Sequence, residues 1–114
     1  GEYTIGWEET LSSVENGEKI AERFDLFENY PNPFNPVTTI LFQLSSPIQI
    51  EIKVFDIAGR HITTLLDQPR MAAGTHEIRW DGKNSDGVSV ASGLYFCRLS
   101  CPGFNKTIKM IFVH

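Results

Sequence analysis

Residues 48–56 read Ile-Gln-Ile-Glu-Ile-Lys-Val-Phe-Asp, and their first seven residues alternate strictly between apolar and polar side chains. Apolar residues stand at every second position from Ile48 to Val54, and polar residues stand between them, from Gln49 to Lys53. Successive side chains of a strand point to opposite faces, so this spacing gathers the apolar groups on one face. The stretch therefore predicts a half-buried strand of an antiparallel sheet.

Further strand-like segments lie on both sides of this stretch. Before it we expect a short strand at Phe24–Phe27 and a longer one at Val37–Leu44. After it we expect strands at Arg60–Leu66, Gly74–Asp81, Val88–Val90, Leu94–Ser100 and Asn105–Val113. The intervening turns are predicted at Ala58-Gly59, at 67–73 with Pro69, at 81–87, and at Pro102-Gly103.

Short strands separated by turns every 8–12 residues or so, without a helical pattern, are typical of a sandwich or barrel. At 114 residues, the chain predicts an all-β fold, an immunoglobulin-like antiparallel β-sandwich of about seven strands. Tyr95 stands two residues before Cys97, as in the tyrosine corner of that fold. The partner cysteine of an immunoglobulin domain is missing from 48–56, so we interpret Cys97 as a small buried side chain.

Cys97 and Cys101 are four residues apart in one predicted strand. Extended chain covers about 13 Å over that spacing, well beyond the Cα separation of a disulfide. We expect free thiols; a bridge would require a sharp turn at Ser100.

Charge divides the chain into two parts. Residues 1–28 hold eight acidic and two basic residues, a net charge of −6, whereas residues 29–114 carry +2. We interpret residues 1–23 as an acidic linker or the tail of an upstream domain, with an early strand at Tyr3–Trp7 as an alternative. The absence of an initiator Met and of a signal-peptide pattern suggests a processed or partial chain. Neither part has the basic stripe that nucleic acids require, and no segment is long and apolar enough to span a membrane.

Residues 30–36 read Tyr-Pro-Asn-Pro-Phe-Asn-Pro. Each proline removes a backbone donor and restricts φ, which excludes a helix and a central strand. We expect a rigid turn in which Tyr30 and Phe34 close one end of the core.

Candidate chemical groups are few, and we expect neither an enzyme nor a cofactor site. His61 and His76 lie on neighbouring predicted strands, but two ligands make a poor zinc site. The loop from Asp81 resembles a calcium loop, yet its third position is Lys83, so a hairpin loop is favoured. Sugar binding through aromatic side chains would use Trp7 or Trp80, although Trp80 ends an apolar face that predicts core packing.

Several segments together identify a family by resemblance. They are the opening Asn29–Ile40, then Val54–Arg60, Ala73–Gly82, Val90–Leu99 and the ending Lys106–Val113. In combination these segments, within residues 24–114, resemble the type A C-terminal sorting domain of the type IX secretion system. The immunoglobulin-like domain of the flagellar hook-capping protein shares several of these features, but the Tyr-Pro-Asn-Pro-Phe-Asn-Pro opening favours the sorting family.

The resemblance implies a role in transport. It makes residues 24–114 a sorting domain that directs an upstream cargo domain of the same polypeptide through the outer membrane of a Gram-negative bacterium. The expected partners are the outer-membrane secretion machinery and a sortase-like protease, for which residues 8–22 would suit cleavage. The protein would be secreted or placed on the cell surface by way of the periplasm. The alternative is a non-catalytic protein- or carbohydrate-binding module of a multidomain secreted enzyme.

Two segments are candidates for recognition. One is the proline-rich opening, and the other is the final strand, where basic residues alternate with apolar ones; that strand could equally complete the sheet without binding anything. The candidate residues are Asn29, Tyr30, Pro31, Asn32, Pro33, Phe34, Asn35, Lys106 and Lys109.

Overall fold

The computed structural model describes residues 23–114, which form seven β-strands. The strands are β1 (Asp25–Leu26), β2 (Thr38–Leu44), β3 (Ile48–Asp56), β4 (His61–Met71), β5 (Gly74–Trp80), β6 (Gly93–Cys101) and β7 (Phe104–Phe112). Over this range no helix is long and apolar enough to cross a membrane. The acidic linker expected at 1–23, the possible strand at Tyr3–Trp7 and the possible cleavage stretch 8–22 lie outside the described residues, apart from the exposed Arg23.

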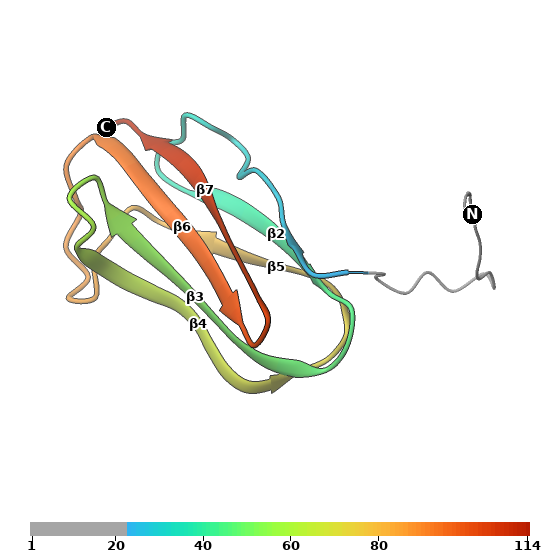
Figure 1. The fold of residues 1–114 in the computed structure, drawn as a ribbon. Coiled ribbons are helices and arrows are strands. Elements are labelled where there is room, and N and C mark those ends of the chain that lie inside the picture. Colours follow the sequence, from blue (N-terminus) through green and yellow to red (C-terminus); the bar gives the residue numbers. More distant parts are fainter. Residues whose placement is uncertain (1–22) are drawn as a thin grey trace.

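The strands pack as two antiparallel sheets, one behind the other (Figure 1). Within residues 23–114, sheet A has the order β1-β2-β5 and sheet B the order β4-β3-β6-β7. The chain crosses between the sheets after β2, after β4 and after β5, which is typical of an immunoglobulin-like sandwich. The predicted fold class is confirmed.

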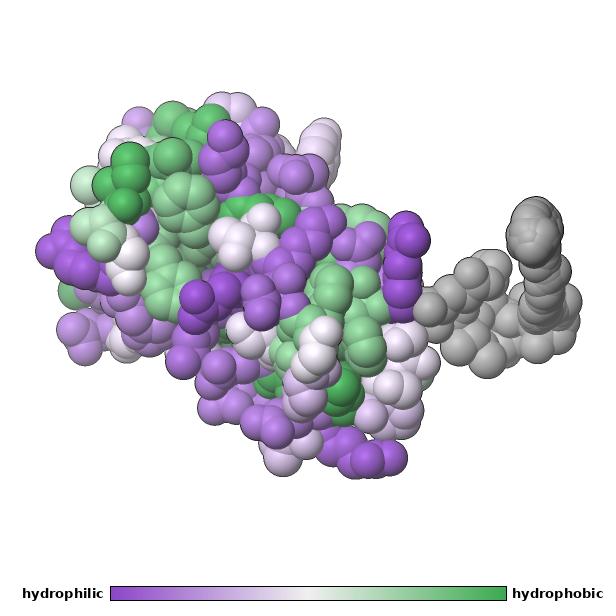
Figure 2. Space-filling model, viewed as in Figure 1, coloured by the Kyte–Doolittle hydropathy of each residue, from purple (hydrophilic) through white to green (hydrophobic). Residues whose placement is uncertain are grey.

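Alternate residues of the strands form the core between the sheets. In β3, Ile50, Ile52 and Val54 are fully buried, and the polar residues between them face outward, as the alternation predicts. The buried apolar side chains are Leu26, Phe34, Ile40, Phe42, Leu44, Ile50, Ile52, Val54, Trp80, Tyr95, Cys97, Leu99, Ile108, Met110 and Phe112. Figure 2 looks onto sheet B, whose outer face mixes hydrophilic and hydrophobic atoms.

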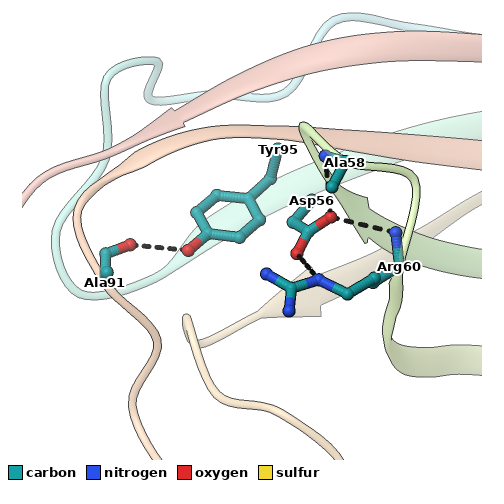
Figure 3. Close-up of polar contacts among 5 residues, drawn as sticks. All are labelled: Asp56, Ala58, Arg60, Ala91 and Tyr95. Carbon is teal, nitrogen blue, oxygen red and sulfur yellow. Dashed lines mark hydrogen bonds and ion pairs between the residues drawn. The ribbon is translucent and has the colours of Figure 1, made fainter.

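Tyr95 forms the predicted tyrosine corner (Figure 3). Its hydroxyl donates a 2.7 Å hydrogen bond to the carbonyl oxygen of Ala91, four residues earlier. Burial raises the pKa of the Tyr95 hydroxyl, and the negative charge of Asp56 on the neighbouring strand raises it further. The hydroxyl therefore keeps its proton and ties the loop before β6 to the core.

Asp56 organises the turn between β3 and β4 (Figure 3). One carboxylate oxygen accepts 2.9 Å hydrogen bonds from the backbone amides of Ala58 and Arg60, and the other accepts a 2.8 Å bond from Nε of Arg60. The amide of Arg60 contributes most to lowering the pKa of Asp56 below its ordinary value. Gly59 has a φ of 84°, a left-handed conformation that favours glycine. The predicted turn at Ala58-Gly59 is confirmed.

Strand β4 is longer than the sequence predicts. It continues to Met71, so the loop expected at 67–73 is wrong over most of its length. The expectation failed because Pro69 lacks an amide hydrogen, which usually ends a strand. Here β4 is an edge strand that pairs with β3 alone among the described strands, and its register shifts between Gln68 and Met71. Proline is tolerated at such an edge irregularity.

The short strand expected at Val88–Val90 is also wrong. In its place an isolated bridge joins Ser89 to Lys83, and a loop folds around Asn84. The Asn84 side-chain oxygen accepts hydrogen bonds from the amides of Asp86 and Val88 at 2.9 and 3.0 Å. Turn chemistry therefore extends beyond its predicted end at Gly87, because one asparagine side chain satisfies backbone donors on both sides of that glycine.

Both cysteines are free thiols, as expected. Cys97 is completely buried, and this burial raises its pKa to about 12. Cys101 is half-buried at the end of β6, where burial raises its pKa as well. Cys97 therefore acts as a small apolar side chain of the core.

Replacing Tyr95 by Phe should lower the free energy of unfolding by about 1 kcal/mol, because the Ala91 carbonyl loses its buried donor. We expect a fall in the thermal midpoint of roughly 4–8 °C for a domain of this size. Tyr30→Phe is the control, since the side chain of Tyr30 is 81% exposed. Equal midpoints for the two variants in calorimetry would contradict a stabilising role for the Tyr95 hydroxyl.

Candidate functional site

The proline-rich opening Asn29–Pro36 runs along one side of the sandwich and touches both sheets. Tyr30 exchanges two 2.9 Å backbone hydrogen bonds with Thr39 of β2 in sheet A. Four residues later, Phe34 forms a parallel bridge to Phe112 of β7 in sheet B. The predicted rigid turn is therefore a crossing segment that closes the gap between the two sheets on this side.

Phe34 fixes this segment to the core. Its ring is 1% exposed and lies 5.4 Å from the ring centre of Trp80 and 5.0 Å from that of Phe112. Burying a side chain of this kind stabilises a fold by about 2 kcal/mol. Its amide donates to the carbonyl of Ile111 at 2.9 Å, and its carbonyl accepts from the amide of Val113 at 3.1 Å. The expectation that Phe34 closes the core is confirmed.

Asn32 uses its side chain to pair with the outer edge of β7. Its Oδ1 accepts a 2.9 Å hydrogen bond from the amide of Ile111, and its Nδ2 donates a 3.4 Å bond to the carbonyl of Lys109. One side-chain amide thus replaces a backbone unit of a neighbouring strand. Because β7 is an edge strand of sheet B, Asn32 satisfies backbone groups that would otherwise face solvent.

Asn29 and Thr38 brace the start of the segment from inside. Asn29 is 4% exposed, and its Nδ2 donates to the hydroxyl of Thr38 at 2.9 Å and to the carbonyl of Pro31 at 3.2 Å. The Thr38 hydroxyl in turn donates to the same carbonyl at 2.8 Å. Asn29 therefore holds the path of the chain and is not available to a partner.

Tyr30 does not close the core as the sequence suggested, and that expectation is wrong. Its side chain is 81% exposed, because Tyr30 pairs with Thr39, whose neighbours Thr38 and Ile40 point inward. Pro31, Asn32, Pro33 and Asn35 are also exposed. The opening therefore divides into two buried anchors, Asn29 and Phe34, and an exposed ridge that begins at Tyr30.

The two predicted lysines have different environments. Lys106 forms a 2.8 Å ion pair with Asp25 of β1, which links the two sheets at the far end of the same side. Lys109 is exposed; its carbonyl bonds to Asn32, while its side chain belongs to the outer face of sheet B. The structure thus brings the opening and Lys109 together but assigns Lys106 to an ion pair.

Sequence reasoning missed three contributors to this edge. Ile111 and Val113 act through backbone groups, which every residue type carries, and both side chains are more than 40% exposed beside the ridge. Gly82 was assigned only to a turn. A Cβ at Gly82 would stand 2.6 Å from the Phe112 ring, so glycine allows that ring to pack under the segment. Gly82 also has a positive φ of 72°, a backbone conformation that favours glycine.

The other candidate groups make local contacts. His61 on β4 bonds to the Thr64 hydroxyl, and His76 on β5 bonds to the carbonyl of Ala72. The sequence predicts the two histidines on neighbouring strands, but β4 and β5 belong to different sheets. Among residues 23–114, no group of three His, Cys, Asp or Glu side chains could hold a metal ion. Trp80 is 1% exposed and its indole donates to the carbonyl of Lys83, which confirms core packing.

The fold and this edge define a small immunoglobulin-like module with a closed side formed by a proline-rich segment and the last strand. The chain belongs to the FlgD Ig-like domain family, which it matches over residues 32–100. A comparison with curated proteins gives no match.

Three solved structures are similar. Dimeric latent PorU from Porphyromonas gingivalis is 25% identical with a TM-score of 0.60, over 79% of this chain and 9% of PorU. PorZ, an essential bacterial surface component of the type IX secretion system of that organism, is 22% identical with a TM-score of 0.50, over 80% of this chain and 11% of PorZ. FlgD from P. aeruginosa is 22% identical with a TM-score of 0.49, over 66% of this chain and 60% of FlgD. The chain thus spans about a tenth of PorU and PorZ.

Asn32→Ala should lower the free energy of unfolding by about 1 kcal/mol, since two backbone groups of β7 lose their partner and must bind water instead. Hydrogen exchange at the Ile111 amide should accelerate. Asn35→Ala is the matched control, because Asn35 is exposed and has no side-chain hydrogen bond to residues 23–114. Unchanged protection of Ile111 in Asn32→Ala would contradict the pairing.

The Asp25–Lys106 ion pair should make the free energy of unfolding depend on pH in the acidic range. The hydrogen bond from Lys106 holds the pKa of Asp25 below its ordinary value of 3.8. The ionised form therefore stabilises the fold above about pH 4, and this contribution is lost as pH falls through the lowered pKa. Asp25→Asn should cost less than about 1 kcal/mol at pH 7 and flatten the decline in acid. The free energy of unfolding is measured by denaturant titration at pH 3 and pH 7, with Asp86→Asn, in an exposed loop, as the control. If the wild type and Asp25→Asn lose the same free energy of unfolding between pH 7 and pH 3, the linkage is refuted.

Proposed function

We propose that this chain is a C-terminal sorting module, which directs an upstream cargo of the same polypeptide across the outer membrane by type IX secretion. In this proposal the folded module docks onto the secretion machinery and catalyses no reaction. The protein would reach the cell surface or the medium from the periplasm. A sortase-like protease would separate cargo from module before residue 23.

One observation carries the proposal. Two of the segments that resemble sorting domains are far apart in the sequence but are hydrogen-bonded along one side of the sandwich: Asn29–Pro36, within the opening, and Lys106–Val113, at the end. Asn32 and Phe34 of the opening are hydrogen-bonded to Ile111 and Val113 of the last strand, whose side chains are exposed, and Tyr30 extends the same segment toward sheet A. A partner could read both segments at once, which suits a signal that must be complete and folded before export.

The composition of this edge also fits docking. Tyr30, Ile111 and Val113 are 81%, 42% and 43% exposed, so the edge presents apolar groups to solvent. Exposed apolar side chains that gather together are typical of interaction sites. Phe34 and Asn29 hold the backbone from below, so little order must be gained on binding.

The likeness to PorZ supports the proposal, because it shows that this fold occurs in a component of type IX secretion. PorZ, itself a surface component of type IX secretion, contains a domain of the same fold over 80% of this chain. The PorU match, at 25% identity, is from the same organism. Sugar binding through Trp80 is not supported, since Trp80 is buried and its indole N–H is already bonded. Trp7, the other tryptophan named for that role, lies outside the described residues.

The test is export of a fluorescent reporter that carries a signal peptide and residues 1–114, in a host with type IX secretion. We expect reporter on the surface or in the medium, and none in a host without the outer-membrane translocon. Truncation after Asn105 should abolish export. Tyr30→Ala should reduce it severalfold with an unchanged thermal midpoint, because an exposed contact is lost and the core is not.

Val88→Ala is the matched control, since Val88 is apolar, 58% exposed and located in the loop between β5 and β6. Its export should equal that of the wild type. Reporter retained in the periplasm as a folded protein would refute the sorting role. Equal loss in Tyr30→Ala and Val88→Ala would refute the assignment of this edge.

A further inference from the structure

Basic side chains gather on the outer face of sheet B, which meets the edge described above at Lys109. Lys53 of β3 stands directly opposite Arg98 of β6, and Arg98 stands opposite Thr107 of β7. Lys109 lies two residues beyond Thr107 on β7, opposite Phe96. Ile52, Val54, Cys97, Leu99, Ile108 and Met110 are buried, so the residues between them point outward. Three basic side chains thus share one face across neighbouring strands, which lie about 4.8 Å apart.

This arrangement is unfavourable for the isolated fold. Like charges directly opposite on neighbouring strands destabilise a sheet. Glu51 partly neutralises Lys53 at 3.5 Å, whereas among residues 23–114 neither Arg98 nor Lys109 has a carboxylate within ion-pair distance. The chain as a whole carries −4, so the positive charge of this region runs against the overall charge.

Aromatic side chains lie beside these charges. The Arg98 guanidinium lies over the Phe55 ring, 4.6 Å from its centre, which holds the group in place by a cation–π contact. An open depression of about 250 Å³ is lined by Phe55, Ile57, Gly59, Phe96, Arg98, Thr107 and Asp56. The Asp56 carboxylate is already bonded to the amides of Ala58 and Arg60 and to Nε of Arg60. The view onto sheet B shows hydrophobic atoms next to strongly hydrophilic ones at the end where the β3–β4 turn lies (Figure 2).

We propose that this depression binds an extended acidic peptide segment of a partner protein. One carboxylate of the segment would pair with Arg98 and another with Lys109, while an apolar side chain between them rests on Phe55 and Phe96. Arg98 suits this role because its planar group is already oriented and can donate two parallel hydrogen bonds to a carboxylate. The site shares Lys109 with the edge described above, whereas Arg98 lies on β6 and makes no contact with the opening.

The charge pattern favours a peptide over a flat anionic surface. Glu51 and Asp67 stand opposite one another farther along the same sheet, so acidic groups follow the basic ones within one face. An anionic membrane would be repelled by that part of the face, whereas a short segment covers only the basic part. Arg98 and Lys109 are diagonal neighbours on adjacent strands, about 7–8 Å apart. Carboxylates on alternate residues of an extended chain have nearly the same separation, about 7 Å.

The test measures binding of fluorescein-labelled heptapeptides in which two glutamates flank a leucine or a phenylalanine at alternate positions. We expect saturable binding to the full 114-residue chain, weakened by salt and absent for peptides with Gln in place of Glu. Arg98→Gln combined with Lys109→Gln should weaken binding at least about tenfold, the effect of losing charge-assisted hydrogen bonds. Lys109→Gln alone should show a smaller loss.

The matched control is Arg70→Gln combined with Lys83→Gln, which removes the same charge from exposed positions elsewhere. This variant should bind like the wild type, and amide NMR shifts on peptide addition should centre on Phe55, Phe96 and Arg98. Equal weakening by the control, or no saturable binding by any of these peptides, would overturn the proposal. Binding to phosphatidylglycerol vesicles without peptide binding, or a dimer that Arg98→Gln disrupts without peptide binding, would also overturn it.

Discussion

The closed side of the sandwich depends on one contact, the packing of the Phe34 ring against the rings of Trp80 and Phe112, which also touch each other. These three rings come from the opening segment, from the end of β5 in sheet A and from β7 in sheet B. Because Phe34 and Phe112 are distant in the sequence, their contact joins the first and last parts of the described chain. The exposed ridge from Tyr30 to Asn35 exists only because the ring beneath it is fixed.

The same contact solves a general problem of β-sandwiches. An edge strand presents unpaired backbone groups, and proteins cover them to prevent aggregation. Here β7 is covered by Asn32, Phe34 and the prolines near them, which lack amide hydrogens and cannot extend the sheet. The opposite edge strand, β4, is protected in another way, by a register shift at Pro69 and charged neighbours. Proline residues thus hinder further strand pairing at both edges of sheet B.

The sequence predicted the parts of the fold that alternation controls. It located β3 to the residue, gave the buried face of β2, and identified Phe34, Trp80, Cys97 and Tyr95 correctly. The prediction from sequence failed where a contact between distant residues determines whether a residue lies in a strand or points inward. Pro69 lies in a strand because that strand is at an edge, which no local pattern reveals. Tyr30 and Phe34 are both aromatic residues beside prolines, and only pairing with Thr39 and Phe112 shows which of them points inward.

Lys109 belongs both to the edge formed by the opening segment and β7 and to the basic face of sheet B. Its carbonyl accepts the bond from Asn32, and its side chain stands on the basic face of sheet B. A change in the opening segment would therefore alter the backbone from which that side chain projects. Tyr30 and Arg98 each belong to one surface only, because Tyr30 pairs with sheet A and Arg98 lies two strands in from the β4 edge and one from β7. Loss of export without loss of peptide binding, or the reverse, would then separate the two roles, whereas substitutions at Lys109 would mix them.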